Sequence, residues 1–282
     1  MYYLLIMVST IMFGLQFFFN KQYQQKEGAG IEKAILFALG TSAVTAIAML
    51  AINRFRIEFT WFSFGLSMVS AMDGILFLYC STKALSKVNL SLYSLFSMLG
   101  GMLLPFFAGI CFFGEALTTK KLLSTAVITI ALFIGMDRKA NRTALWLCLY
   151  VFVLNGMAGV LSKWHQSGTG MNLSSGGFML LKSLVTIAIC AILLLFSKKS
   201  GFKLNDAKSA VKNITGYGLM TGFANYFILI ALLHVNASVQ YPMITGGTII
   251  VSTLISVLSK EKVTGQNIIS SLLALFATLL LL

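Results

Sequence analysis

The stretch GGMLLPFFAGICFFGEALTTKKLLS, residues 100–124, returns without a gap as GGTIIVSTLISVLSKEKVTGQNIIS, residues 246–270. Two leading glycines, a glutamate (Glu115 and Glu261), a threonine and the final serine coincide, and most other pairs exchange one apolar residue for another. Each copy predicts a long apolar helix, a tight charged turn and a second apolar helix. The chain is therefore expected to contain two copies of one structural unit.

The composition favours a membrane protein over a soluble one. Hydrophobic residues make up 58% of the chain and charged residues only 10%, with a mean hydropathy of +0.89. Soluble domains carry about 25% charged residues, and about 20 apolar residues of helix suffice to cross a bilayer. Since nearly the whole chain falls into apolar runs of that length, we expect an all-α integral membrane protein.

Ten membrane spans are predicted. Helices are favoured over a barrel because the apolar runs are continuous and a spanning backbone must satisfy its own hydrogen bonds. The predicted spans cover residues 2–20, 33–52, 60–82, 89–113, 121–136, 143–162, 177–197, 213–234, 239–259 and 265–282.

The repeat divides the chain into two five-helix halves, residues 1–139 and 140–282. Pro105 and Pro242 fall in the fourth span of each half. Gly14, Lys21 and Gln24, in and just after the first span, align with Gly156, Lys163 and Gln166. Five is an odd number of spans, so the two repeats must be inverted in the membrane. Inverted repeats place a binding site between the halves, near the bilayer midplane.

The positive charges predict an orientation. With the first residue of each following span included, the turns after the odd-numbered spans carry fifteen Lys and Arg residues, and those after the even-numbered spans carry five. The positive-inside rule then places both termini outside the cytoplasm. The net charge of +13 is spread over these short turns and forms no basic module, so nucleic-acid binding is not expected. Short loops point to a bacterial plasma membrane.

This pattern resembles the drug/metabolite transporter superfamily, in particular its ten-helix EamA-like branch. The resemblance is carried by the paired turns Glu115–Thr118 and Glu261–Thr264, and by Gly14, Lys21, Gly156 and Lys163 at the start of each repeat. It covers essentially the full length of the chain. It implies a solute carrier, commonly an exporter of amino acids, related metabolites or toxic compounds. We interpret Glu115 and Glu261 as residues that stabilise their turns.

Two charged residues remain once the turns are accounted for, Asp73 and Lys182. A charge at the centre of a spanning helix costs about 2.5–3.5 kcal/mol on insertion scales, so it usually faces a cavity or a partner. Asp73 is a candidate for proton coupling or for binding a substrate amine, with a structural pair as the alternative. Lys182 is expected either to extend to the interface or to meet Asp73 or a substrate carboxylate.

Further polar residues within the predicted spans are candidates for substrate binding or coupling. Amides in a bilayer more often bond a neighbouring helix than a ligand, but these lie at related positions of the two halves. They are Gln16, Tyr79, Asn155, Asn225 and Tyr226.

The leading functional hypothesis is a secondary transporter that works by alternating access, coupled to protons or to exchange. A lipid-linked substrate flippase and a non-transporting scaffold subunit are the alternatives. Direct ATP drive is not expected, because no Walker A motif occurs, and an enzyme is not expected, because the sequence has neither an HExxH motif nor a cluster of carboxylates and histidines. The four cysteines lack CxxC spacing, so no metal and no cofactor are expected. Two fused halves can form a pathway within one chain, which favours a functional monomer with a small molecule and the lipid bilayer as partners.

Overall fold

The computed structural model describes residues 1–28, 30–87, 90–134, 142–168, 172–196, 204–258 and 265–281. Within these ranges the chain is helical, without a strand. The helices are α1 (Tyr2–Glu27), α2 (Ile31–Ile52), α3 (Trp61–Leu85), α4 (Leu90–Phe112), α5 (Thr119–Ile134), α6 (Arg142–Ser167), α7 (Ser175–Phe196), α8 (Ala207–Leu232), α9 (Ala237–Leu258) and α10 (Gly265–Leu279).

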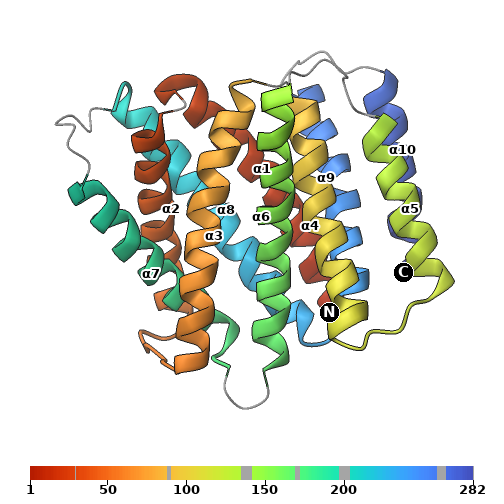
Figure 1. Cartoon of the computed structure of the whole chain (residues 1–282), viewed down its shortest axis with the longest axis horizontal. Helices are drawn as coiled ribbons and strands as arrows, with labels where there is room; N and C mark the ends of the chain where they lie inside the picture. Colours follow the sequence, from red (N-terminus) through yellow and green to blue (C-terminus); the bar gives the residue numbers. More distant parts are fainter. Residues whose placement is uncertain are drawn as a thin grey trace.

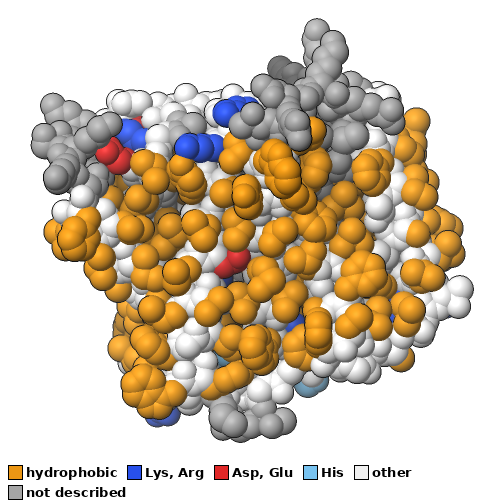
Figure 2. Space-filling view, in the orientation of Figure 1, with side chains coloured by type: hydrophobic (Ala, Val, Ile, Leu, Met, Phe, Trp, Pro, Cys, Tyr) orange, Lys and Arg blue, Asp and Glu red, His pale blue; other side chains and the backbone are white. Residues whose placement is uncertain are grey.

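Among the described residues, six helices are long and apolar enough to cross a membrane: α1, α2, α3, α6, α7 and α8. Shorter apolar helical stretches cover Phe96–Phe112 and Ile268–Leu279. The prediction of a helical membrane protein is thus confirmed. The space-filling view shows a mostly hydrophobic face over α3 and α6, as expected for a surface in contact with lipid (Figure 2).

The ends of some helices differ from the predicted spans. Helix α1 was expected to end at residue 20 but continues to Glu27 and stops at Gly28, whose φ of 91° favours glycine. The reason is that hydropathy locates the apolar part of a helix, whereas the polar turn from Lys21 to Glu27 continues the same backbone hydrogen bonding.

Successive helices run in alternating directions across the bundle (Figure 1). Helix α1 packs against α8 and α9, while α6 packs against α3 and α4. Helices α2 and α7 contact each other at one side, and α5 and α10 contact each other at the opposite edge. The N-terminal five helices therefore interlock with the C-terminal five.

Glycines allow these helices to approach closely. A Cβ atom on Gly14 of α1 would lie 2.3 Å from Val251 of α9, and one on Gly156 of α6 would lie 2.6 Å from Leu104 of α4. At Gly100 the added atom would lie only 1.9 Å from the backbone oxygen of Phe152. Such small-residue contacts replace the hydrophobic driving force that is absent between helices in lipid.

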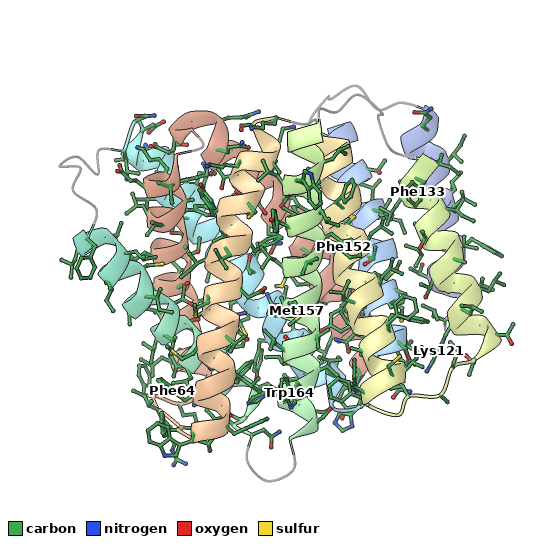
Figure 3. The ribbon with its side chains drawn as sticks, viewed as in Figure 1. Phe64, Lys121, Phe133, Phe152, Met157 and Trp164 are labelled. Carbon is green, nitrogen blue, oxygen red and sulfur yellow. The ribbon has the colours of Figure 1, made fainter. Side chains whose placement is uncertain are left out.

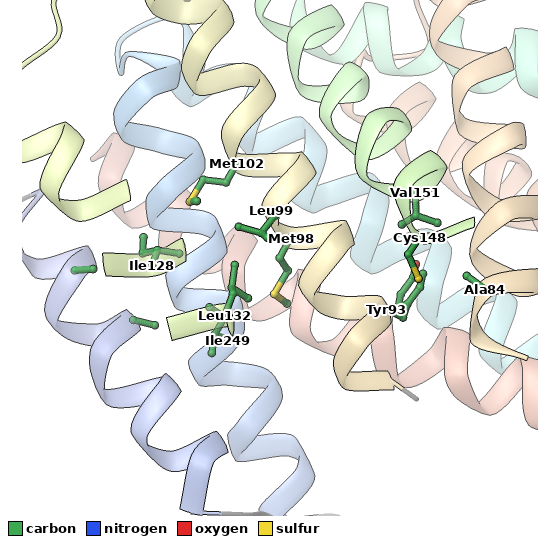
Figure 4. Close-up of a cluster of buried hydrophobic side chains, with 12 residues drawn as sticks. Ala84, Tyr93, Met98, Leu99, Met102, Ile128, Leu132, Cys148, Val151 and Ile249 are labelled. Carbon is green, nitrogen blue, oxygen red and sulfur yellow. The ribbon is translucent and has the colours of Figure 1, made fainter. Parts of the chain in front are cut away.

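One buried apolar cluster joins α4 to five other helices, α3, α5, α6, α9 and α10 (Figure 4). Tyr93 and Met102 of α4 belong to it together with Cys148 of α6, Ile128 of α5 and Ile249 of α9. The Tyr93 hydroxyl donates a hydrogen bond to Ser81 Oγ at 2.9 Å, so its polar atom is satisfied. The cluster holds the α5–α10 edge of the molecule against the rest.

Gly100→Ala is expected to lower stability by about 1–3 kcal/mol, because the new methyl group meets backbone that cannot move aside. Gly65→Ala in α3 is the matched control, since its Cβ would meet nothing within 4 Å. That control should be neutral or slightly stabilising. Thermal unfolding of both purified variants in detergent measures the difference, and equal melting temperatures would contradict the role given to Gly100.

Candidate functional site

A central cavity of about 260 Å³ lies between the two sets of five helices. Its walls are formed by residues of α1, α2, α3, α4, α6, α7, α8 and α9, so both sets contribute equally many helices. The lining mixes apolar side chains such as Phe13, Phe17 and Ile244 with hydroxyl, amide and charged groups. This is the composition of a site for a small molecule.

Asp73 of α3 and Lys182 of α7 both line this cavity. The Asp73 residue is 8% exposed and Lys182 is half-buried. The two groups interact electrostatically, yet among the described residues no direct ion pair joins them. The sequence left open whether they meet, and the structure places them in one cavity without a salt bridge. Acidic atoms are visible at mid-height on the otherwise apolar face (Figure 2).

Three predicted amides also line the cavity, and each is fixed at one end. Gln16 Oε1 accepts a hydrogen bond from Thr221 Oγ1 at 2.7 Å, and Asn225 Nδ2 donates to the Thr221 carbonyl at 2.8 Å. Asn155 Nδ2 donates to the Ser97 carbonyl at 2.6 Å. Within the described part of the chain these bonds leave Gln16 Nε2 and the amide oxygens of Asn155 and Asn225 able to bind a ligand.

Tyr79 and Tyr226 were also predicted as site residues, but the structure places neither in the cavity lining. The Lys83 ammonium lies 4.5 Å from the centre of the Tyr79 ring. Tyr226 packs against the apolar cluster that contains Phe178 and Leu229. Adjacent residues on a helix point about 100° apart, so Tyr226 faces away from the cavity that its neighbour Asn225 lines.

The sequence interpretation missed several hydroxyl groups of the wall. Thr41 and Thr45 lie on one face of α2, and Thr221 lies one turn before Asn225 on α8. Their spacing of four residues was a usable signal, because such positions share a helix face. Thr45 Oγ1 donates to the Gly218 carbonyl at 3.0 Å, which also ties α2 to α8.

Glu115 joins parts of the bundle that are distant in sequence. Its carboxylate accepts hydrogen bonds from the backbone N–H groups of Ala237 and Ser238, both at 2.8 Å, at the first turn of α9. The Lys163 ammonium of α6 lies 3.0 Å from it. It therefore caps another helix, which its interpretation as a turn-stabilising residue did not include. Glu261, its repeat counterpart, lies outside the described residues. Lys121 and Trp164 mark the same end of the molecule (Figure 3).

The pKa of Glu115 lies below its ordinary value. Burial alone would raise it, but hydrogen bonds from Ser238, Lys163 and Ala237 together outweigh that effect. The helix N-terminus adds a favourable dipole for a negative charge. Glycines make room for this arrangement: Gly114 has a φ of 66°, and a Cβ on Gly109 would lie 2.7 Å from Glu115 Oε2.

A second buried carboxylate, Glu27, plays a similar part where α1 ends and α8 begins. It accepts hydrogen bonds from the backbone N–H groups of Asn205 at 2.8 Å and Asp206 at 3.0 Å, and from Lys33 Nζ at 2.9 Å. Glu27 and Glu115 lie at opposite ends of the bundle (Figure 1). The sequence did not single out Glu27, because the residues before α8 that it bonds are far along the chain.

Within the described residues, no three His, Cys, Asp or Glu side chains come together as a metal site. His165 is fully buried and stacked on Phe178, with ring centres 3.8 Å apart, and its Nε2 lies 2.9 Å from Ser63 Oγ. These contacts give His165 a packing role.

Glu115→Gln is expected to destabilise the protein at pH 7 by about 2–4 kcal/mol, since Lys163 loses its buried partner. The folded pKa of Glu115 is depressed, so its stabilisation is complete above the ordinary value of 4.5 and is lost as the pH falls through the folded pKa. The gap in melting temperature between wild type and variant should therefore narrow at acid pH.

The control for this prediction is Glu58→Gln. Glu58 accepts a hydrogen bond from Ser174 Oγ at 2.9 Å in an exposed setting, so the change should cost less than about 1 kcal/mol. A gap between wild type and Glu115→Gln that stays constant from pH 7 to pH 4 would argue against a charge-based role.

Comparisons with known proteins support the fold and give no information on function. No family model matches the chain, and no curated protein matches it. A solved crystal structure, described only as that of a protein, superposes with a TM-score of 0.76 over 98% of this chain and 94% of its own. At 14% sequence identity, this similarity shows a shared fold alone.

Proposed function

We propose that this protein is a secondary active transporter, and an exporter, of small metabolites such as amino acids or amphipathic compounds. It would work by alternating access, coupled to protons or to exchange. The observation that carries the proposal is the central cavity, walled by both sets of five helices and containing Asp73 and Lys182. Charged groups are retained inside a membrane protein mainly on substrate or ion pathways.

Inverted repeats, and a place in the EamA-like branch of the drug/metabolite transporters, belong to this proposal. The helix contacts support both parts of this proposal. Helix α1, the first of its set, packs on α8 and α9, the third and fourth of the other set. Helix α6, the first of the second set, packs in the same way on α3 and α4. The aligned glycines Gly14 and Gly156 lie at equivalent contacts, against α9 and α4. All ten helices would then span the bilayer, with the shorter α5 and α10 paired at one edge.

Alternating access requires the two halves to part at one end of the cavity at a time. The Glu27 and Glu115 contacts lie at opposite ends, and each links helices of the two sets. Opening toward either side would release the contacts at that end while those at the other end hold. Buried carboxylates on helix N-termini suit this task, because they form discrete contacts that are either made or broken.

The flippase and scaffold alternatives are less well supported. A volume of about 260 Å³ lies below the range of about 300–1,000 Å³ typical of sites for drug-sized ligands, which favours a small solute over a lipid. A scaffold has no use for a charged cavity, since burying such groups only lowers its stability.

The inverted arrangement can be tested with two cysteines at aligned positions. Lys120 and Gln266 occupy equivalent sites in the two repeat blocks, and both are exposed. In a cysteine-free background, a membrane-impermeant maleimide should label Lys120→Cys in intact cells and Gln266→Cys only after permeabilisation. This follows from inversion together with termini outside the cytoplasm. Labelling of both from the same side would rule out inversion.

Transport can be tested with the purified chain in liposomes. A panel of amino acids, amines and sugars should include compounds that drive a current in wild type, and Asp73→Asn should abolish the current or its pH dependence. Glu58→Gln, a change at a carboxylate in an exposed setting outside the cavity, is the control and should retain transport. Absence of a current or tracer flux with every soluble compound would contradict the proposed function.

A further inference from the structure

We propose that the cavity selects zwitterions, with Asp73 binding the cationic group of the solute and Lys182 its anionic group. This rests on the proposed transport function and narrows its substrate class. The two residues lie on adjacent helices of one wall, since α3 packs against α7.

The geometry of the two charges leads to this inference. Asp73 and Lys182 are near enough to interact electrostatically, but among the described residues neither takes part in a direct ion pair. No described residue donates a hydrogen bond to the Asp73 carboxylate, although only 8% of the Asp73 surface is exposed to solvent. Buried charges are stable only when they are compensated. A solute that brings one charge of each sign compensates both at once.

The remaining lining residues exclude solutes of a single charge. Apart from Asp73 and Lys182, every residue that lines the cavity is uncharged. The site is therefore neutral as a whole. A simple cation would pair with Asp73 but leave Lys182 uncompensated and repelled, and a simple anion would do the reverse. Only a molecule with both charges leaves no buried charge unpaired.

Two amides elsewhere in the cavity lining suit the uncharged part of such a solute. Gln16 of α1 and Asn225 of α8 are held by their bonds to Thr221 and present an amide N–H and a carbonyl oxygen. These groups are neutral and fixed in direction, so they can hydrogen-bond a polar substituent without changing the charge balance. The charged wall would then recognise the class of solute, and the amide wall would discriminate among its members.

Binding to the full-length protein in detergent tests the proposal. The probes are α-, β- and γ-amino acids and glycine betaine, together with N-acetyl-leucine as an anion and leucinamide as a cation. We expect at least one zwitterion to raise the melting temperature and to bind at least tenfold more tightly than either singly charged leucine derivative. Failure of every zwitterion to bind, or equal binding of a singly charged derivative, would overturn the proposal.

Variants assign the two charges. Asp73→Asn should weaken zwitterion binding at least tenfold and shift the preference toward anions, whereas Lys182→Gln should shift it toward cations. Glu58→Gln and Lys208→Gln, which change residues outside the cavity, are matched controls and should keep wild-type binding. If either Asp73→Asn or Lys182→Gln does not fold, the variant that folds still tests the assignment. An unchanged preference between anions and cations in that variant would overturn the assignment.

Flux measurements separate this proposal from the transport function. Zwitterion binding without flux would support the site and contradict the transporter. Flux of singly charged or neutral solutes, without zwitterion binding, would support the transporter and overturn the zwitterion site.

Discussion

The close contact between α1 and the α8–α9 pair, and between α6 and the α3–α4 pair, is the constraint on which the rest of the structure depends. Helices in lipid gain little from hydrophobic burial against each other, so packing must hold them together. Gly14 and Gly156 permit this packing because a side chain at either position would collide with the facing helix. Since the two sets of five helices pack against each other through these contacts, the space that remains lies between them, and both sets line it.

Charged groups serve two different purposes in this framework. Glu27 and Glu115 lie at the ends of the bundle, where each carboxylate receives two backbone N–H groups and a lysine. Such groups are fully compensated and hold the helix termini in place. Asp73 and Lys182 lie within the helices and lack comparable partners among the described residues. This contrast distinguishes charges that maintain the fold from the charges to which we assign ligand binding in our proposal.

Much of the candidate site could be read from the sequence, because a charge or an amide in an apolar run is conspicuous. Asp73, Lys182, Gln16, Asn155 and Asn225 were found in this way, and all line the cavity. The sequence could not show that Tyr79 and Tyr226 lie outside the cavity lining. Which face of a helix points inward depends on how the helix is rotated about its axis. Thr41, Thr45 and Thr221 escaped notice because hydroxyls bonded to helix carbonyls are common in any spanning helix.

The sequence by itself determined the class of structure: an all-helical membrane protein, whose long apolar runs and scarce charges admit few other folds. Its internal repeat also indicated which segments are equivalent. Tertiary structure alone decided which side chains share the cavity, that Asp73 and Lys182 both line it without a salt bridge between them, and that Glu115 caps a helix more than a hundred residues away. Periodicity along the chain reports the environment of each helix, whereas contacts between helices depend on how each one is rotated and shifted against its neighbours.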